Sequence, residues 1–254
     1  MTKLADIVQF LNETLNVSKI SDDSVNGLQV EGAPEVKKIV LGVDASIDLF
    51  GKAKASGANL IIVHHGIFWD GKDCRAVGIM ANRLKYLLEH GISLYAVHHP
   101  LDVHTQTGNS AVIALKIGLK KTMPFGKLAD GSCVGILGEL EMEMPVDSIL
   151  SKIEEVIGKA VRKDLFGKKT VRKIAIVSGG GVSYAEEAAK EGADLFLTGE
   201  PKHVAYHNIK ELEINAVYAG HYETEKFGVI ALGKTLENRF KGLKTEFINC
   251  PTGL

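Results

Sequence analysis

The stretch Leu60-Ile61-Ile62-Val63-His64-His65-Gly66 is a short apolar run that ends in two histidines and a glycine. Buried parallel strands have continuous apolar sequences of this kind. Two further apolar runs end in similar residues, and their endings are His98-His99-Pro100-Leu101-Asp102 and His221-Tyr222-Glu223-Thr224-Glu225. Because open α/β sheets bind ligands at the carboxyl ends of their strands, the three endings predict a functional site.

The chain also contains an internal repeat. Two matches share an offset of 135 positions, 36–43 with 171–178 and 53–60 with 188–195, and a third relates 92–97 to 214–219 at an offset of 122. In each copy an apolar strand precedes an Ala-rich helical stretch, a glycine and a second apolar strand. This is the pattern of a parallel sheet covered by helices. The predicted fold class is therefore α/β, with two related three-layer modules whose sheets are mainly parallel.

The domain boundary is predicted at Thr122–Gly131, a segment that carries proline, glycine and charge. We expect residues 1–125 together with roughly 228–254 to form the first module, residues 126–227 to form the second, and the metal site to lie between them. Further expected elements are helices over 109–119, 145–157 and 223–238 and strands over 133–140 and 245–248.

The composition limits the class of protein. With 30 Lys and Arg against 31 Asp and Glu, the formal net charge is −1, so no general excess of positive charge attracts nucleic acid or anionic lipid. The three cysteines are widely separated and form no Cys-x-x-Cys pair, which argues against a disulfide framework or a thiolate zinc site and favours a cytoplasmic location. Residues 1–16 predict an amphipathic helix rather than a signal peptide, and no apolar run has membrane-spanning length.

The strand endings carry the ligands of a metal site. Neutral imidazoles and carboxylates bind zinc, iron, manganese or nickel, and the candidate ligands are His64, His65, Asp102, His221 and Glu225. Such a set can hold two divalent ions, which lower the pKa of bound water toward neutrality and so suit hydrolysis. His221 and Glu225 share one face if a helix begins near His221. His64 and His65 are adjacent, so on a continuing strand they would point to opposite faces. Both can act as metal ligands, for different ions, only if the strand ends there and the chain turns at Gly66.

Each candidate also has a structural explanation. A single histidine at a strand end is usually a hydrogen-bonded or surface residue, Asp102 can cap the following helix, and Glu225 can favour a helix amino terminus. The coincidence of three such endings favours a metal site. His98, His99 and His104 are secondary candidates, either for orienting a ligand or for structure.

Three other features have two interpretations each. His203 and His207 either line the site or, as we favour, lie on a solvated helix face. Phe68 and Trp69 are either core aromatics or a wall for a planar substrate. The segment Ser178-Gly179-Gly180-Gly181 is either a phosphate-binding loop or a tight strand-to-helix turn that needs a positive φ.

These residues together resemble the NIF-three family, whose bacterial members are often named GTP cyclohydrolase I type 2 homologues. The resemblance covers nearly the whole chain. It rests on Asn26-Gly27-Leu28-Gln29-Val30, Gly42-Val43-Asp44, His64-His65-Gly66 with Phe68-Trp69, His98 with Pro100-Leu101-Asp102, Thr198-Gly199-Glu200, and Gly220-His221 with Thr224-Glu225.

The resemblance implies a two-domain α/β fold and two divalent metal ions per chain at His64, His65, Asp102, His221 and Glu225, with Glu225 bridging them. It also implies a toroidal homohexamer built as a trimer of dimers. Longer members carry an additional domain between the two halves, and this chain is too short to contain it.

Two functions follow as hypotheses. One is a metal-dependent hydrolase that acts on a nucleotide-like or other phosphorylated or heterocyclic small molecule, with cyclohydrolase chemistry indicated by the family name alone. The other is a non-catalytic ring-forming protein that binds nucleic acid such as DNA, or a protein partner, with no membrane involved. The net charge of −1 gives nucleic-acid binding no general support.

Overall fold

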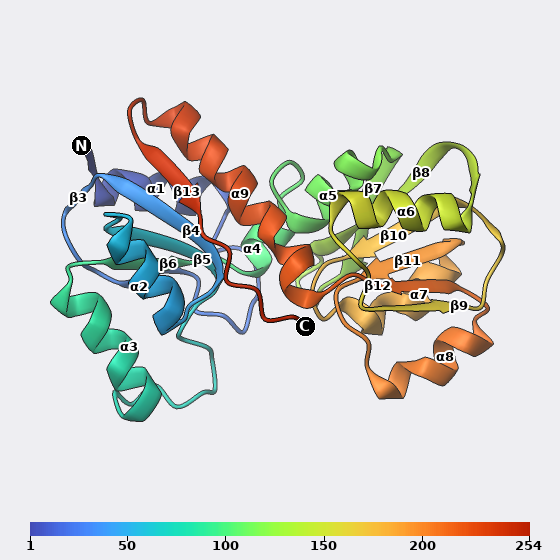
Figure 1. The fold of residues 1–254 in the computed structure, drawn as a ribbon, viewed down its shortest axis with the longest axis horizontal. Coiled ribbons are helices and arrows are strands. Elements are labelled where there is room, and N and C mark those ends of the chain that lie inside the picture. The colour runs from blue at the N-terminus through green and yellow to red at the C-terminus, as the bar shows by residue number, and fades with distance from the viewer. The chain divides into compact units, whose positions relative to one another are not determined.

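The computed structural model describes residues 1–254, which form two compact units. The first comprises Met1–His104 and Gly228–Cys250, and the second comprises Thr105–Phe227 and Pro251–Leu254. Each unit has its own sheet with helices on both faces (Figure 1). None of the helices is at once long enough and apolar enough to cross a membrane.

The first unit contains a five-stranded sheet. Its strand order is β13 (Lys244–Phe247), β4 (Lys38–Asp44), β5 (Leu60–His65), β6 (Ser93–Ala96) and β2 (Gly27–Val30). The first four strands are parallel and β2 is antiparallel to β6. A small antiparallel pair, β1 (Thr2–Lys3) and β3 (Glu35–Val36), lies outside this sheet.

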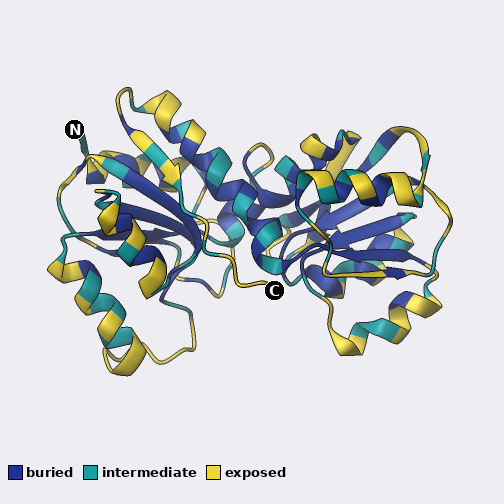
Figure 2. Ribbon diagram, viewed as in Figure 1, coloured by how far each residue is buried: buried dark blue, intermediate teal, exposed yellow.

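Helices bury both faces of this sheet, which explains why its strands are continuously apolar. Helices α1 (Leu4–Thr14) and α9 (His221–Arg239) contribute to one core, with Leu60 and Ile62 of β5. Helices α2 (Ile47–Ala55) and α3 (Gly78–Glu89) contribute to the other, with Ile61 and Val63. Successive strand residues point to opposite faces, so a strand buried on both sides shows no polar alternation. The buried strands stand out against the half-exposed outer helices in Figure 2.

The second unit contains a six-stranded sheet. Its strand order is β7 (Lys120–Lys127), β8 (Cys133–Pro145), β10 (Thr170–Val177), β11 (Leu195–Thr198), β12 (Asn215–Tyr218) and β9 (Arg162–Leu165). Strands β10, β11 and β12 are parallel, and the strands outside them are antiparallel. Helices α5 (Asn109–Ile117) and α6 (Val146–Val156) cover one face, and α7 (Ala185–Lys190) and α8 (Tyr206–Glu211) lie on the other (Figure 1).

The strand registers confirm the internal repeat residue by residue. In the first unit Ile39 pairs with Leu60, and in the second Ile174 pairs with Leu195, at the same offset of 135 positions. The next pairings are Leu60 with Ser93 and Leu195 with Asn215, which reproduce the offset of 122. The two units therefore share a parallel β-α-β-α-β core.

Residues 105–125 lie in the second unit, although the sequence analysis places them in the first module. The reason is packing: Ile113 and Ile117 of α5 belong to the second core, with Ile149 and Ile153 of α6. The strand β7 also pairs with β8 of the same sheet. The proline, glycine and charge in 122–131 mark the β7–β8 hairpin, not a boundary between units. Residues 228–250 belong to the first unit, and β13 pairs with β4 there.

Candidate metal centre

Two histidines stand at the end of β5 in the first unit. The His64 ring is buried, and its Nδ1 donates a hydrogen bond to the carbonyl oxygen of Val97 at 2.9 Å. The His65 Nδ1 donates to Asp44 Oδ1 at 2.8 Å, and Asp44 is the register partner of His65 on β4. Because a carbonyl or carboxylate oxygen can only accept, the proton of each neutral ring lies on Nδ1. The Nε2 atom of each ring therefore carries a lone pair, as a metal ligand must.

Asp102 lies against this pair of histidines. It is the last residue of the short helix α4 (His99–Asp102) and is only 9 % exposed. Its Oδ2 lies 3.4 Å from His64 Nε2. Both atoms are hydrogen-bond acceptors when the imidazole is neutral and the carboxyl is ionised, so they repel each other unless a cation lies between them.

His98 joins the same cluster. Ligand atoms of His64, His65 and His98 all lie within 4.8 Å of one another. The His98 Nδ1 donates to Asp22 Oδ1 at 2.8 Å, which leaves its Nε2 as an acceptor in the neutral ring. Burial lowers the pKa of His98 and so favours that neutral form. The structure thus brings this secondary candidate to the predicted ligands.

Asp22 organises the turn that holds His98. Its carboxylate also accepts the backbone N–H of His99 and the side-chain amide of Asn26, each at 2.8 Å. Burial alone would raise the pKa of Asp22, but the hydrogen bonds from His98, Asn26 and the Ser24 N–H hold it well below its usual range. The His99 Nδ1 donates to the Ser21 carbonyl at 3.2 Å, and the two rings of His98 and His99 stack at 4.3 Å.

The two aromatic residues after Gly66 have different surroundings in the structure. Phe68 packs against the apolar core of the first unit. The Trp69 indole N–H donates to the Gly66 carbonyl at 3.2 Å, and its ring centroid lies 5.2 Å from that of His98 and 6.0 Å from that of His65. Trp69 therefore forms an apolar wall beside the histidines, while Phe68 is a core residue.

The second unit carries its own histidine and carboxylate cluster at the start of α9. The helix begins at His221, as the i, i+4 spacing requires, and His221 Nε2 lies 3.1 Å from Glu225 Oε2. The His221 Nδ1 donates to Glu200 Oε2 at 3.0 Å. Burial by itself lowers the pKa of His221, but Glu225 and Glu200 outweigh it and raise the pKa to about 9. Glu225 is only 3 % exposed, so its charge requires a cation close by.

The glycine-rich segment after β10 is a tight turn against this cluster. Gly179 has a φ of +61°, and a Cβ added there would collide with the Glu225 carboxylate and lie 3.0 Å from His221 Nε2. The Gly179 N–H donates to Thr224 Oγ1 at 2.9 Å, and the Ser178 N–H donates to Ser110 Oγ at 3.2 Å. Because both amides are already engaged, the turn interpretation is favoured over the phosphate-binding loop.

The remaining histidines lie elsewhere. His203 and His207 are exposed in the η2 (His203–Ala205) and α8 segment, as the solvated-face interpretation predicts. His90 is the C-cap residue of α3, and its Nδ1 donates to the Tyr86 carbonyl at 2.7 Å. Burial lowers the pKa of His104.

The sequence reasoning missed the three carboxylates that orient the histidines, which are Asp22, Asp44 and Glu200. A signal for two of them was present, because Asp44 ends one predicted strand and Glu200 follows another. In both units a histidine at one strand end donates to a carboxylate from a neighbouring strand end. Such outer partners fix the tautomer and orientation of ligand histidines.

Comparison with known proteins places the chain in a family. The model of the family Duf34/NIF3 (NGG1p interacting factor 3) matches residues 2–252. The chain belongs to the Duf34/NIF3 family. A curated relative from Archaeoglobus fulgidus, named "GTP cyclohydrolase 1 type 2 homolog", is 43 % identical over 251 residues, which cover 99 % of each chain.

Solved structures of similar proteins have the same fold. A protein from Thermus thermophilus matches with a TM-score of 0.91 and 38 % identity, over 100 % of both chains. A structure described as "protein ybgI, unknown function" matches with a TM-score of 0.92 and 38 % identity, also over 100 % of both chains. The Duf34/NIF3 assignment therefore fixes the α/β fold, while the name of the curated relative states a homology and not an activity.

Gly179 provides a test of the His221 cluster. We expect Gly179→Ala to lower zinc affinity by at least about tenfold, because its Cβ displaces Glu225 and a disturbed ligand environment typically costs that much. The control is Gly192→Ala, which also has a positive φ, +74°, but no atom within 4 Å of the added Cβ. Both variants should lose about 1 kcal/mol of stability from the backbone strain. Zinc titration calorimetry and urea unfolding measure the two effects, and equal zinc affinity in the two variants would contradict this account.

Proposed function

We propose that His64, His65, Asp102, His221 and Glu225 hold two divalent metal ions and that the protein uses them to hydrolyse a small molecule. The substrate class we propose is a nucleotide-like or other phosphorylated or heterocyclic compound. One observation carries the proposal: His64 Nε2 and His221 Nε2 each face a buried carboxylate oxygen, at 3.4 and 3.1 Å. Such facing groups are stable together only when a positive charge lies between them, either a metal ion or a proton on the imidazole.

The donor set suits a divalent transition metal. Imidazole nitrogens and carboxylate oxygens bind zinc, iron, manganese and nickel, and no cysteine belongs to either cluster. The Nδ1 atoms of His64, His65 and His221 each donate to a fixed acceptor, the arrangement that holds ligand histidines in other metal sites. Membership of the Duf34/NIF3 family supports the same set of residues.

The residues of the chain have distinct roles in this proposal. A pair of divalent ions would supply Lewis-acid activation of water at neutral pH. Glu225 would be the carboxylate that both ions share, and Asp44 and Glu200 hold His65 and His221 in the tautomer that leaves Nε2 available. His98, held by Asp22, has an Nε2 acceptor that can take up and return a proton. Trp69 offers an apolar face for a planar substrate.

The metal content tests the ligand set. We expect the wild type to retain about two divalent ions per chain after reconstitution and the double variant His64→Ala, Glu225→Ala to lose both, because a dinuclear site needs several protein ligands per ion. His207→Ala, which removes an exposed imidazole from the second unit, should retain both ions. Elemental analysis of dialysed protein gives the number of metal ions per chain. Full occupancy in the double variant would contradict the proposed ligand set.

Turnover tests the hydrolase proposal. Nucleotides, phosphoesters and cyclic amide or amidine substrates are screened with each candidate metal, with and without a chelator. We expect turnover that the chelator abolishes and that Glu225→Gln lowers by at least about 10³-fold, since loss of the bridging charge removes activation of water. If no substrate is turned over with any metal, while an oligonucleotide or protein partner binds the wild type and Asp102→Ala equally well, the binding-protein hypothesis replaces this one.

We also propose that the chain assembles into a closed homohexamer, a trimer of dimers. The support is the family resemblance and the general preference of homo-oligomers for closed symmetry. Multi-angle light scattering should give a mass close to six times the 27.4 kDa of one chain. A strictly monomeric species at micromolar concentration would contradict the assembly.

A further inference from the structure

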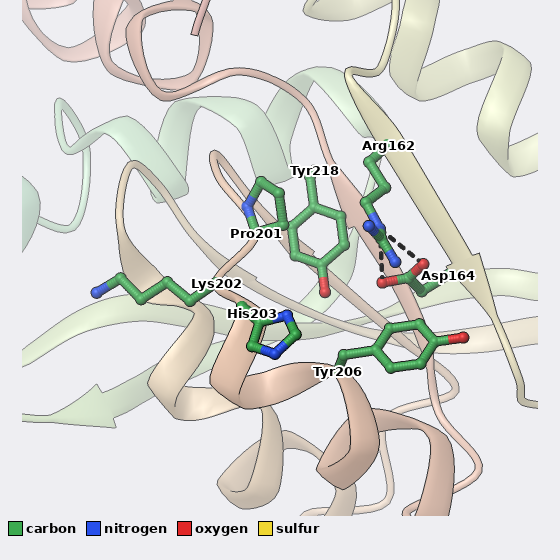
Figure 3. A pocket seen from close by; sticks show the side chains of 7 residues that line it. All are labelled: Arg162, Asp164, Pro201, Lys202, His203, Tyr206 and Tyr218. Atoms are coloured by element: carbon green, nitrogen blue, oxygen red, sulfur yellow. Dashed lines mark hydrogen bonds and ion pairs between the residues drawn. The ribbon is translucent and has the colours of Figure 1, made fainter.

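A separate cavity of about 360 Å³ lies in the second unit (Figure 3). Its lining residues are Arg162, Asp164, Pro201, Lys202, His203, Tyr206 and Tyr218. They come from the edge strand β9, the end of β12, and the segment that follows β11 and leads into α8. A cavity of this size suits a small organic molecule rather than a single ion.

The cavity contains an arginine that is fixed in position while its terminal nitrogens remain available. Arg162 Nε donates to both oxygens of Asp164, at 2.9 and 3.1 Å, and the guanidinium carbon lies 5.3 Å from the centre of the Tyr206 ring. The terminal Nη groups make no hydrogen bond within the chain. A guanidinium held by a carboxylate and an aromatic ring is prepared for bidentate binding of an oxyanion.

The balance of charge in the cavity is positive. Asp164 is 7 % exposed; its charge is balanced by Arg162, and its carboxylate also accepts a hydrogen bond from the Tyr218 hydroxyl. Burial, and then Asp164, raise the pKa of Tyr218 to about 12, so this hydroxyl stays protonated and donates. Lys202 also lines the cavity, and Figure 3 shows its ammonium extended away from Arg162. Neither this ammonium nor the exposed ring of His203 has a partner in the chain. The cavity therefore attracts an anion and offers ring faces on His203 and Tyr206 (Figure 3).

A structural ion pair alone does not explain this arrangement. The Arg162 side chain is 46 % exposed, and an ion pair at such exposure contributes little to stability. Packing would also not require Lys202 and His203 beside it. A ligand with negative charge accounts for all three cationic or donor groups at once.

We propose that this cavity binds the phosphate group of a small phosphomonoester, with Arg162 as the main anchor and Lys202 and His203 as further contacts. That this compound is the substrate rests on the hydrolase function proposed above. The chain order supports the link, because Glu200 directly precedes Pro201 and Tyr218 stands three positions before His221. The ends of β11 and β12 thus lead both to residues of the His221 cluster and to residues that line the cavity.

Binding to metal-free protein tests the cavity without any turnover. Chelator-treated full-length protein is titrated with inorganic phosphate and with adenosine 5′-monophosphate by calorimetry and ³¹P NMR. We expect both probes to bind, Arg162→Gln to weaken binding by about tenfold or more, and Lys202→Gln to weaken it about two- to fivefold, since charge-assisted hydrogen bonds are lost. Arg172→Gln is the control, because Arg172 is an exposed arginine of the same unit that pairs with Glu139 at 3.6 Å.

A second variant separates a loss of binding from a loss of folding. Arg162→Gln leaves the Asp164 carboxylate without its cation, so the double variant Arg162→Gln, Asp164→Asn is measured beside it and should fold and still bind weakly. Equal affinity of the wild type and Arg162→Gln for both probes, or no preference of the wild type for phosphate over chloride, overturns the proposal. Binding of a long oligonucleotide without binding of either probe also overturns it. Probe binding that depends on Arg162 in a protein without hydrolase activity supports the cavity and rejects only the proposed function.

Discussion

The hydrogen bond donated by histidine Nδ1 to a fixed oxygen is the interaction on which the candidate centre depends. It occurs at His64, His65, His98 and His221, with a carbonyl or a carboxylate as the acceptor. Each bond selects one tautomer, so the Nε2 atom of each neutral ring is an acceptor and not a donor. Without these bonds the same four rings could donate to the nearby carboxylates, and the site would have no need of a cation.

The parallel registers explain how these bonds arise. Pairing of β4 with β5 sets Asp44 opposite His65, and the following strand brings Val97 within reach of His64. In the second unit the equivalent strand ends bring Glu200 to His221. The repeat therefore duplicates the scaffold, while the residues at the strand ends have diverged: His65 corresponds to Glu200 at the offset of 135. Two copies of one fold can thus supply different ligands.

The sequence predicted the core of the fold, and the position of the three histidine-rich segments at strand ends, for a physical reason. Buried parallel strands have continuous apolar sequences, which are easy to recognise. Polar residues directly after such a sequence must lie at the carboxyl end of the strand, where open α/β sheets bind ligands. The placement of residues 105–125 could not be predicted, because α5 is assigned by contacts of Ile113 and Ile117 with α6, which is distant in sequence. The role of Asp22 was equally hidden, since aspartates also favour turns and helix starts.

The candidate centre requires the fold to accept a local loss of stability. Glu225 and Asp102 are almost fully buried, and desolvating a carboxylate is unfavourable unless a positive charge accompanies it. At His221 the metal-free protein meets this need with a proton, which explains why the neighbouring glutamates raise the pKa of that imidazole to about 9. A divalent ion must displace this proton, and its binding couples to the folded state because only the folded strands assemble the ligands. The continuous apolar core beneath the strand ends stabilises the scaffold, and that stability permits acceptor groups to face one another at the edge of each sheet.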